Sequence, residues 1–73
     1  MVRYGNISLA SDGIYAIDSA NGDKLADGLA AHNAIAVALE KADRLGQSVY
    51  VYDTQDGEDA EMIEVAPTGP AGR

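Results

Sequence analysis

Residues 29–46 read LAAHNAIAVALEKADRLG, and this stretch decides the fold because it carries the only helical pattern in the chain. Its apolar side chains recur at spacings of three and four residues and form one stripe: Ala31, Ile35, Ala38, Leu39, Ala42 and Leu45. Gly46 follows as a C-terminal cap, and Arg44 stands in the last turn, where the helix dipole favours cations. Asp27 is the candidate N-cap, with helix entry there or two to three residues later. Because the stripe is rich in alanine, we expect the helix to lie close to a sheet.

The residues before this helix have the pattern of short strands. Apolar runs flank Asp12-Gly13 and Asn21-Gly22, two dipeptides that favour tight hairpin turns. A meander of three strands is therefore predicted, and the strands span residues 3–10, 13–18 and 23–26.

A second hairpin is predicted after the helix, within SVYVYDTQDGEDAEMIEV at residues 48–65. Valine and tyrosine alternate in its first half, which places Val49 and Val51 on one strand face and Tyr50 and Tyr52 on the other. The segment EMIEV at its end alternates as well. The Asp-Gly pair at residues 56–57 lies between the two runs and favours a turn.

These elements together predict an α+β fold with the order β-β-β-α-β-β. We expect an antiparallel sheet of four to five short strands with one helix packed on one face. A single domain is predicted for residues 1–66. The proline- and glycine-containing end, residues 67–73, is expected to be a disordered C-terminal tail.

Size and composition argue against a reaction centre. A chain of 73 residues buries only about 60% of its unfolded surface and has little room for a supported cleft. Cysteine is absent and His32 is the only imidazole, so neither a zinc site nor a Ser-His or Cys-His arrangement is expected. The carboxylates near Gly57 and Gly22 do not have the spacing of a calcium loop. We therefore predict no catalytic residue, no metal, no cofactor and no enzymatic activity.

The charge of the chain indicates its partners. Its net charge of −7 repels phosphate groups, so direct nucleic-acid binding is not expected. Six carboxylates fall within residues 53–64, and the only Lys or Arg after Leu45 is Arg73. A basic surface of a protein or nucleoprotein complex fits this imbalance, although acidity also serves solubility. No signal peptide or membrane span is recognised in the sequence, so the cytoplasm is the expected compartment.

The tyrosine face of the second hairpin is the other candidate binding feature. If the valines and Ile63 face the helix, the opposite face carries Tyr50, Tyr52, Met62 and Glu64, joined by Ile14 or Tyr15 according to register. Stacking on RNA bases needs a positive groove, which the acids exclude. A homodimer, a different protein partner, or simple cross-strand stabilisation remain as alternatives. The candidate partner-binding residues are Tyr50, Tyr52, Asp53, Asp56, Glu58, Asp59, Glu61 and Glu64.

In its overall character the chain resembles small phage-encoded anti-CRISPR proteins. The residues that carry the resemblance are the hairpin acids Asp53, Asp56, Glu58, Asp59, Glu61 and Glu64, with Asp12, Asp18, Asp23 and Asp27 at other turns. No shared motif supports it, and the acids cluster at turns rather than in the two rows of a DNA backbone. The resemblance implies a non-catalytic inhibitor that acts as a DNA mimic and occupies the basic DNA-binding path of a CRISPR effector complex.

Two alternatives to this function stay open at the level of sequence. The chain fits a small dimeric structural or accessory domain whose acidity serves solubility. It also fits a subunit of an enzyme that another chain completes.

Overall fold

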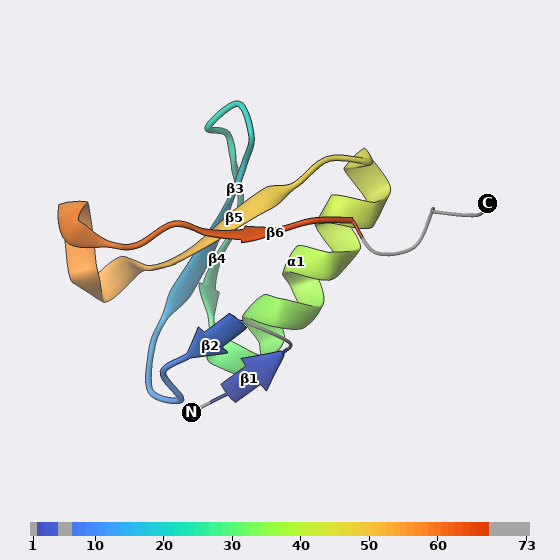
Figure 1. Cartoon of the computed structure of the whole chain (residues 1–73). Helices are drawn as coiled ribbons and strands as arrows, with labels where there is room; N and C mark the ends of the chain where they lie inside the picture. Colours follow the sequence, from blue (N-terminus) through green and yellow to red (C-terminus); the bar gives the residue numbers. More distant parts are fainter. Residues whose placement is uncertain (1, 5–6, 68–73) are drawn as a thin grey trace.

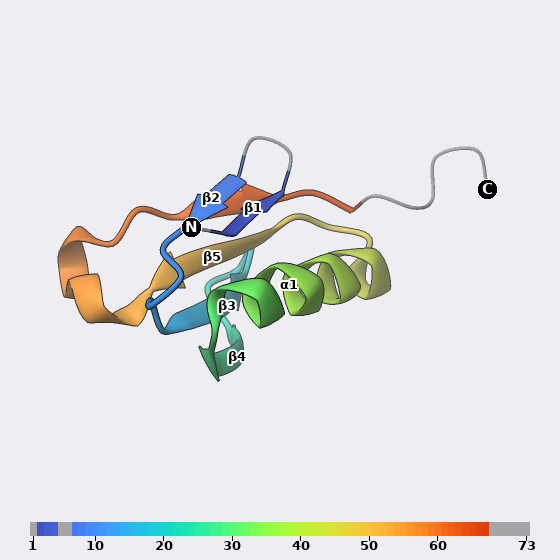
Figure 2. The same ribbon diagram turned by 90° about the horizontal axis from the view of Figure 1, so that it is seen from below.

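A four-stranded antiparallel sheet and one helix make up most of the computed structural model, which describes residues 2–4 and 7–67 (Figure 1). The sheet has the order β4-β3-β5-β6, and its strands are β3 (Tyr15–Ser19), β4 (Lys24–Leu29), β5 (Val49–Asp53) and β6 (Ile63–Val65). The helix α1 (Ala31–Leu45) runs along one face of this sheet, as Figure 2 shows. The predicted α+β fold, with an antiparallel sheet and one helix on one face, is confirmed.

The turn at Asn21-Gly22 forms the hairpin that the sequence predicts. Gly22 has a φ of 92°, a conformation that costs glycine little because it has no Cβ. The Ser19 hydroxyl accepts hydrogen bonds from the backbone N–H groups of Asn21 and Asp23, at 3.2 and 3.1 Å. This turn joins β3 to β4 in antiparallel pairing, with Asp18 opposite Lys24.

The first predicted strand is two strands in the structure. β1 (Val2–Tyr4) and β2 (Ile7–Leu9) pair with each other in a separate antiparallel sheet. The expected hairpin at Asp12-Gly13 is therefore wrong, because β2 pairs with β1 and not with β3. A tight turn still forms there, where the Gly13 N–H donates to the Ala10 carbonyl at 3.1 Å.

The N-cap of the helix lies three residues after Asp27, at the late end of the range that the sequence predicts. Its N-cap is Ala30, which makes no side-chain capping hydrogen bond, and Asp27 instead lies within β4. The strand continues through Asp27 because β4 pairs with β3 as far as Leu29 opposite Tyr15. The C-terminal end agrees with the prediction, since Gly46 adopts the left-handed conformation and its N–H donates to the Ala42 carbonyl.

The hydrophobic core lies between α1 and the sheet, with Leu9 closing it from the small β1–β2 sheet. Leu9, Ile17, Val49 and Val51 are its largest fully buried side chains. The helix contributes mainly small residues to this core: Ala31, Ala34, Ile35, Ala38 and Ala42. Small side chains allow close approach of helix and sheet, as expected from the stripe in the sequence.

The tail predicted for residues 67–73 lies outside the described residues except for Pro67. Among the described residues, no helix combines the length and the hydrophobicity that crossing a membrane requires.

Candidate functional site

The sheet face opposite α1 is here the outer face, and it carries Ala16, Asp18, Tyr50, Tyr52 and Glu64. Strand register brings these residues together: Ala16 lies opposite Tyr52, and Tyr50 lies between Asp18 and Glu64. Val49 and Val51, which alternate with the tyrosines along β5, are buried in the core. Both tyrosines are half-buried and lie outside this core. The predicted division of β5 into a valine face and a tyrosine face is confirmed.

Burial shows which of Ile14 and Tyr15 lies on the outer face of the sheet. Tyr15 is 4% exposed and packs beneath the helix, where its hydroxyl accepts a hydrogen bond from the Ala10 N–H at 2.9 Å. Ile14 precedes β3 and is 41% exposed. Ile14 is therefore the residue that borders the outer face.

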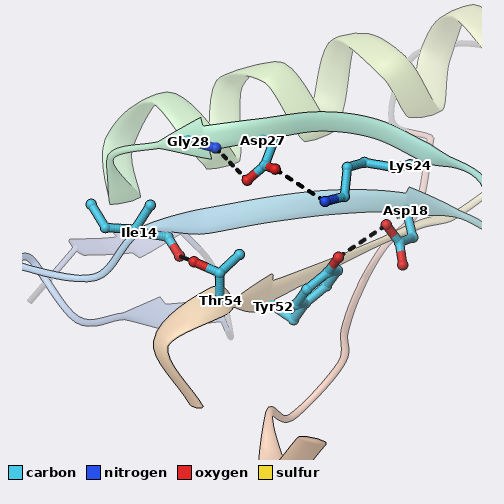
Figure 3. A network of polar contacts seen from close by, with 7 residues as sticks. All are labelled: Ile14, Asp18, Lys24, Asp27, Gly28, Tyr52 and Thr54. Atoms are coloured by element: carbon cyan, nitrogen blue, oxygen red, sulfur yellow. Dashed lines mark hydrogen bonds and ion pairs between the residues drawn. The ribbon is translucent and has the colours of Figure 1, made fainter. Parts of the chain in front are cut away.

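Tyr52 is fixed to β3 through its hydroxyl group. This hydroxyl donates to Oδ1 of Asp18 at 3.3 Å (Figure 3). Partial burial of the phenol, together with the nearby negative charge of Asp18, raises the pKa of Tyr52 above its ordinary value. The hydroxyl thus stays protonated and able to donate at neutral pH.

An exposed ion pair lies on β4 beside this hydrogen bond (Figure 3). The ammonium of Lys24 contacts Oδ2 of Asp27 at 3.0 Å, and Oδ1 of Asp27 accepts from the Gly28 N–H at 2.7 Å. The hydrogen bond from Lys24, followed by the one from Gly28, lowers the pKa of Asp27. The same contact raises the pKa of Lys24. Lys24 is therefore the cation that borders the outer face, and Asp27 holds it.

The hairpin tip is the second acidic region. Two short 3-10 turns that meet at a kink at Gly57, together η1 (Thr54–Asp59), join β5 to β6 and project away from α1 (Figure 1). Both the N–H and the hydroxyl of Thr54 donate to the Ile14 carbonyl at 2.8 Å, which ties the tip to β3. Asp53 accepts from the Gln55 N–H at 2.9 Å and so serves as the N-cap of η1. Gly57 takes the positive φ of 60° that the expected Asp-Gly turn requires.

The predicted partner-binding residues thus fall into two groups. Tyr50, Tyr52 and Glu64 lie on the outer face, and Asp53 lies at the junction with the tip. The remaining residues are exposed carboxylates of the tip and of the segment after it: Asp56, Glu58, Asp59 and Glu61. The structure does not merge these groups into one compact site.

The sequence did not identify Lys24 as a member of this surface. Lys24 joins the outer face only through the pairing of β3 with β4, whereas Ala16, on the same side of the sheet, is fully buried. A local pattern contains no signal for that strand order. The only sequence signal for Lys24 is the spacing Lys24…Asp27, which is uninformative in a strand.

The described residues contain no group of three or more His, Asp or Glu side chains placed to hold a metal ion. No pocket forms in the described part of the chain either, so the outer face is an open surface. Comparison of the chain with protein-family models, with curated proteins and with solved structures finds no match.

Proposed function

We propose that this chain is a non-enzymatic protein-binding module that docks onto a basic surface of a protein or nucleoprotein complex. One observation carries the proposal: the segment from β5 through η1 to β6 has six carboxylates and no Lys or Arg. Four of them, Asp56, Glu58, Asp59 and Glu61, are exposed at or beside the tip. The Asp-Gly turn of this projecting hairpin does not require so many carboxylates.

The physical advantage of such a hairpin lies in association. Clustered carboxylates steer a positively charged partner from a distance, and ions around both surfaces are released on contact. The half-buried tyrosines on the outer face add contacts that depend less on salt, since tyrosine combines a large apolar ring with a polar hydroxyl. The tip is therefore assigned to steering and the outer face to the final contact.

The partner that the resemblance to anti-CRISPR proteins suggests is the DNA-binding path of a CRISPR effector complex. In that role the tip carboxylates occupy the positions of DNA phosphates and compete with target DNA. Lysine- and arginine-lined grooves are the surfaces that bind phosphate backbones, so they also attract this hairpin.

Charge reversal of the tip tests this proposal. The variant Asp56→Lys, Glu58→Lys and Asp59→Lys is compared with a control of equal charge change, Asp12→Lys, Asp23→Lys and Glu40→Lys, at exposed positions off the tip. Binding of target DNA by purified effector complexes is measured by mobility shift with each variant as competitor. We expect the natural chain and the control to compete better than the tip variant, and competition to weaken with added salt. Equal competition by both variants, or an affinity unchanged between low and high salt, contradicts the proposal.

The alternative of a dimeric accessory domain rests on the apolar groups that border the outer face. Ile14 and Met62 are 41% and 48% exposed, and a second copy of the chain would cover them. Light scattering at increasing protein concentration separates the two functions. A monomer that binds a basic partner supports docking, whereas a dimer without affinity for basic partners supports the alternative.

A further inference from the structure

We infer that the outer face takes one arginine side chain of the partner, stacked on the ring of Tyr50 between the carboxylates of Asp18 and Glu64. This inference rests on the proposed function and deepens it, because it names the cationic group that the outer face recognises. The tip steers any basic surface, but the row Asp18, Tyr50 and Glu64 distinguishes one cation from another.

The row follows from strand register. Tyr50 on β5 lies directly opposite Asp18 on β3 and directly opposite Glu64 on β6. Neighbouring strands lie about 4.8 Å apart, so the two carboxylate-bearing residues flank the ring across a span of roughly 10 Å. A planar guanidinium that stacks on a tyrosine ring has N–H groups at its rim, and these point toward both flanks. Ring and carboxylates thus match three features of arginine: its flat face, its charge and its several donors.

Tyr50 is the available ring on this face. Within the described residues its hydroxyl makes no hydrogen bond, whereas the Tyr52 hydroxyl is bound to Asp18. That bond uses Oδ1 of Asp18, and Figure 3 shows the second oxygen turned away from Tyr52. Oε2 of Glu64 accepts from the Ser48 hydroxyl at 2.7 Å, which fixes one oxygen of the carboxylate that lies opposite Tyr50 in the strand register. Both carboxylates are positioned and still have acceptor capacity.

Lys24, the cation that borders the outer face, does not occupy the position between Asp18 and Glu64. Lys24 lies opposite Asp18 in the register of β3 and β4, but its ammonium forms an ion pair with Asp27 at 3.0 Å. Asp27 therefore holds the ammonium on β4 rather than beside Tyr50. Removing Lys24 is expected to strengthen the row for an external cation rather than weaken it.

Other occupants fit the row less well. An apolar partner surface would remove Asp18 and Glu64 from water without compensation, which is costly for a charged group. A nucleic acid would bring phosphates against the same carboxylates. A second copy of this chain carries the same net charge of −7 and would bring further carboxylates against the row. Charge complementarity therefore favours a basic polypeptide with an exposed arginine.

The test titrates the chain with three homopeptides of equal length, made of arginine, of lysine or of neutral citrulline, and follows backbone and ring signals by isotope-edited NMR. We expect the arginine peptide to bind severalfold tighter than the lysine peptide and to shift signals of Asp18, Tyr50 and Glu64. Tyr50→Ala is expected to weaken arginine binding about threefold to fivefold, with Tyr50→Phe close to the natural chain because the ring is retained. Asp18→Asn with Glu64→Gln is expected to weaken it by a similar factor. Lys24→Gln is expected to tighten it.

The matched control is Asp56→Asn with Glu58→Gln, which removes two carboxylates from the tip instead of from the row. Equal binding of the arginine and lysine peptides, or loss of arginine preference in the tip variant alone, overturns the inference and leaves the proposed docking function intact. If neither cationic peptide binds at low salt, the arginine inference and the proposed docking function are both overturned. Each variant is first compared with the natural chain by thermal unfolding, and Tyr50→Phe keeps the test decisive where Tyr50→Ala fails to fold.

Discussion

The two faces of β5 lie in opposite environments. On the inner face, Val49 and Val51 are 0% and 1% exposed and pack beneath the alanines of α1. On the outer face, Tyr50 and Tyr52 are half-buried and lie among carboxylates. The five residues of β5 therefore pack into the core on one side and face solvent on the other. The inner face thus specifies the fold, and the outer face is the side on which the proposed docking function depends.

The largest expected effect comes from the inner face. Ile17 lies at the centre of the sheet between Ala26 and Val51 and is fully buried. Ile17→Ala is expected to lower the free energy of unfolding by about 2–5 kcal/mol, since it removes buried methyl groups and leaves a cavity. Urea denaturation measures the loss, which is large beside the roughly 5–15 kcal/mol stability of ordinary domains.

The control for this prediction is the same substitution at Ile14, which is 41% exposed at the border of the outer face. Ile14→Ala is expected to cost less than about 1 kcal/mol, because the side chain is already partly in water. Equal losses at the two positions would mean that the faces do not differ in the way that their burial indicates.

A smaller effect is expected at Gly13, where the chain enters the large sheet. A Cβ at this position would lie 2.5 Å from Cε2 of Tyr15 and 2.9 Å from Oδ2 of Asp53. The ring of Tyr15 cannot yield easily, because it is 4% exposed and its hydroxyl holds the Ala10 N–H. Gly13→Ala is therefore expected to lower the free energy of unfolding by about 1–3 kcal/mol, the usual cost of an overpacked core.

Whether Gly13→Ala lowers or raises the free energy of unfolding shows which effect dominates, the close approach of Tyr15 and Asp53 or the backbone entropy of glycine. Gly13 is not among the glycines with positive φ, so on backbone grounds alone alanine would stabilise the protein by about 0.4–1 kcal/mol. Thermal unfolding of Gly13→Ala distinguishes these effects. A rise in the melting temperature would show that Tyr15 and Asp53 move aside and that close approach is not the reason for glycine.

Gly13 also illustrates what the sequence could and could not predict. Asp12-Gly13 and Asn21-Gly22 carry equally good turn signals, yet only the second joins two paired strands. The difference lies in tertiary contacts, because Gly13 makes room for the core ring of Tyr15 and for the carboxylate of Asp53. Local turn chemistry was therefore sufficient at Gly22 and insufficient at Gly13.

The same distinction holds for the candidate site. The alternation of valine and tyrosine has a period of two, so both faces of β5 were readable from residues 48–53 alone. The acidic neighbours Asp18 and Glu64 were expected beside the rings, but Lys24 was not, because it reaches the outer face only through the order of strands in the sheet. The choice between Asp27 and a later start of α1 had a similar cause, since pairing of β4 with β3 as far as Leu29 retains Asp27 in the strand.

The smallest expected effect concerns Tyr52 and separates the two tyrosines of the outer face. Tyr52→Phe removes the hydroxyl that donates to Asp18 and is expected to lower the free energy of unfolding by about 0.5–1 kcal/mol at neutral pH. The expected loss is at the lower end for hydrogen bonds because the 3.3 Å contact is long and partly open to water. Tyr50→Phe is the control and is expected to leave stability unchanged, as measured by urea denaturation of both variants.

Alkaline pH sharpens this last difference, because burial and the charge of Asp18 raise the pKa of Tyr52 in the folded chain. As pH rises past about 10, the ordinary pKa of tyrosine, the unfolded chain loses this proton before the folded chain does. The folded state then binds more protons, so the stability contribution present at lower pH is lost as pH rises through the raised pKa. The ultraviolet phenolate titration of the natural chain minus that of Tyr52→Phe is therefore expected to have its midpoint above 10. A midpoint at or below that value would contradict the partly buried, carboxylate-facing position of the Tyr52 hydroxyl, and with it the contrast between a bound Tyr52 and an available Tyr50.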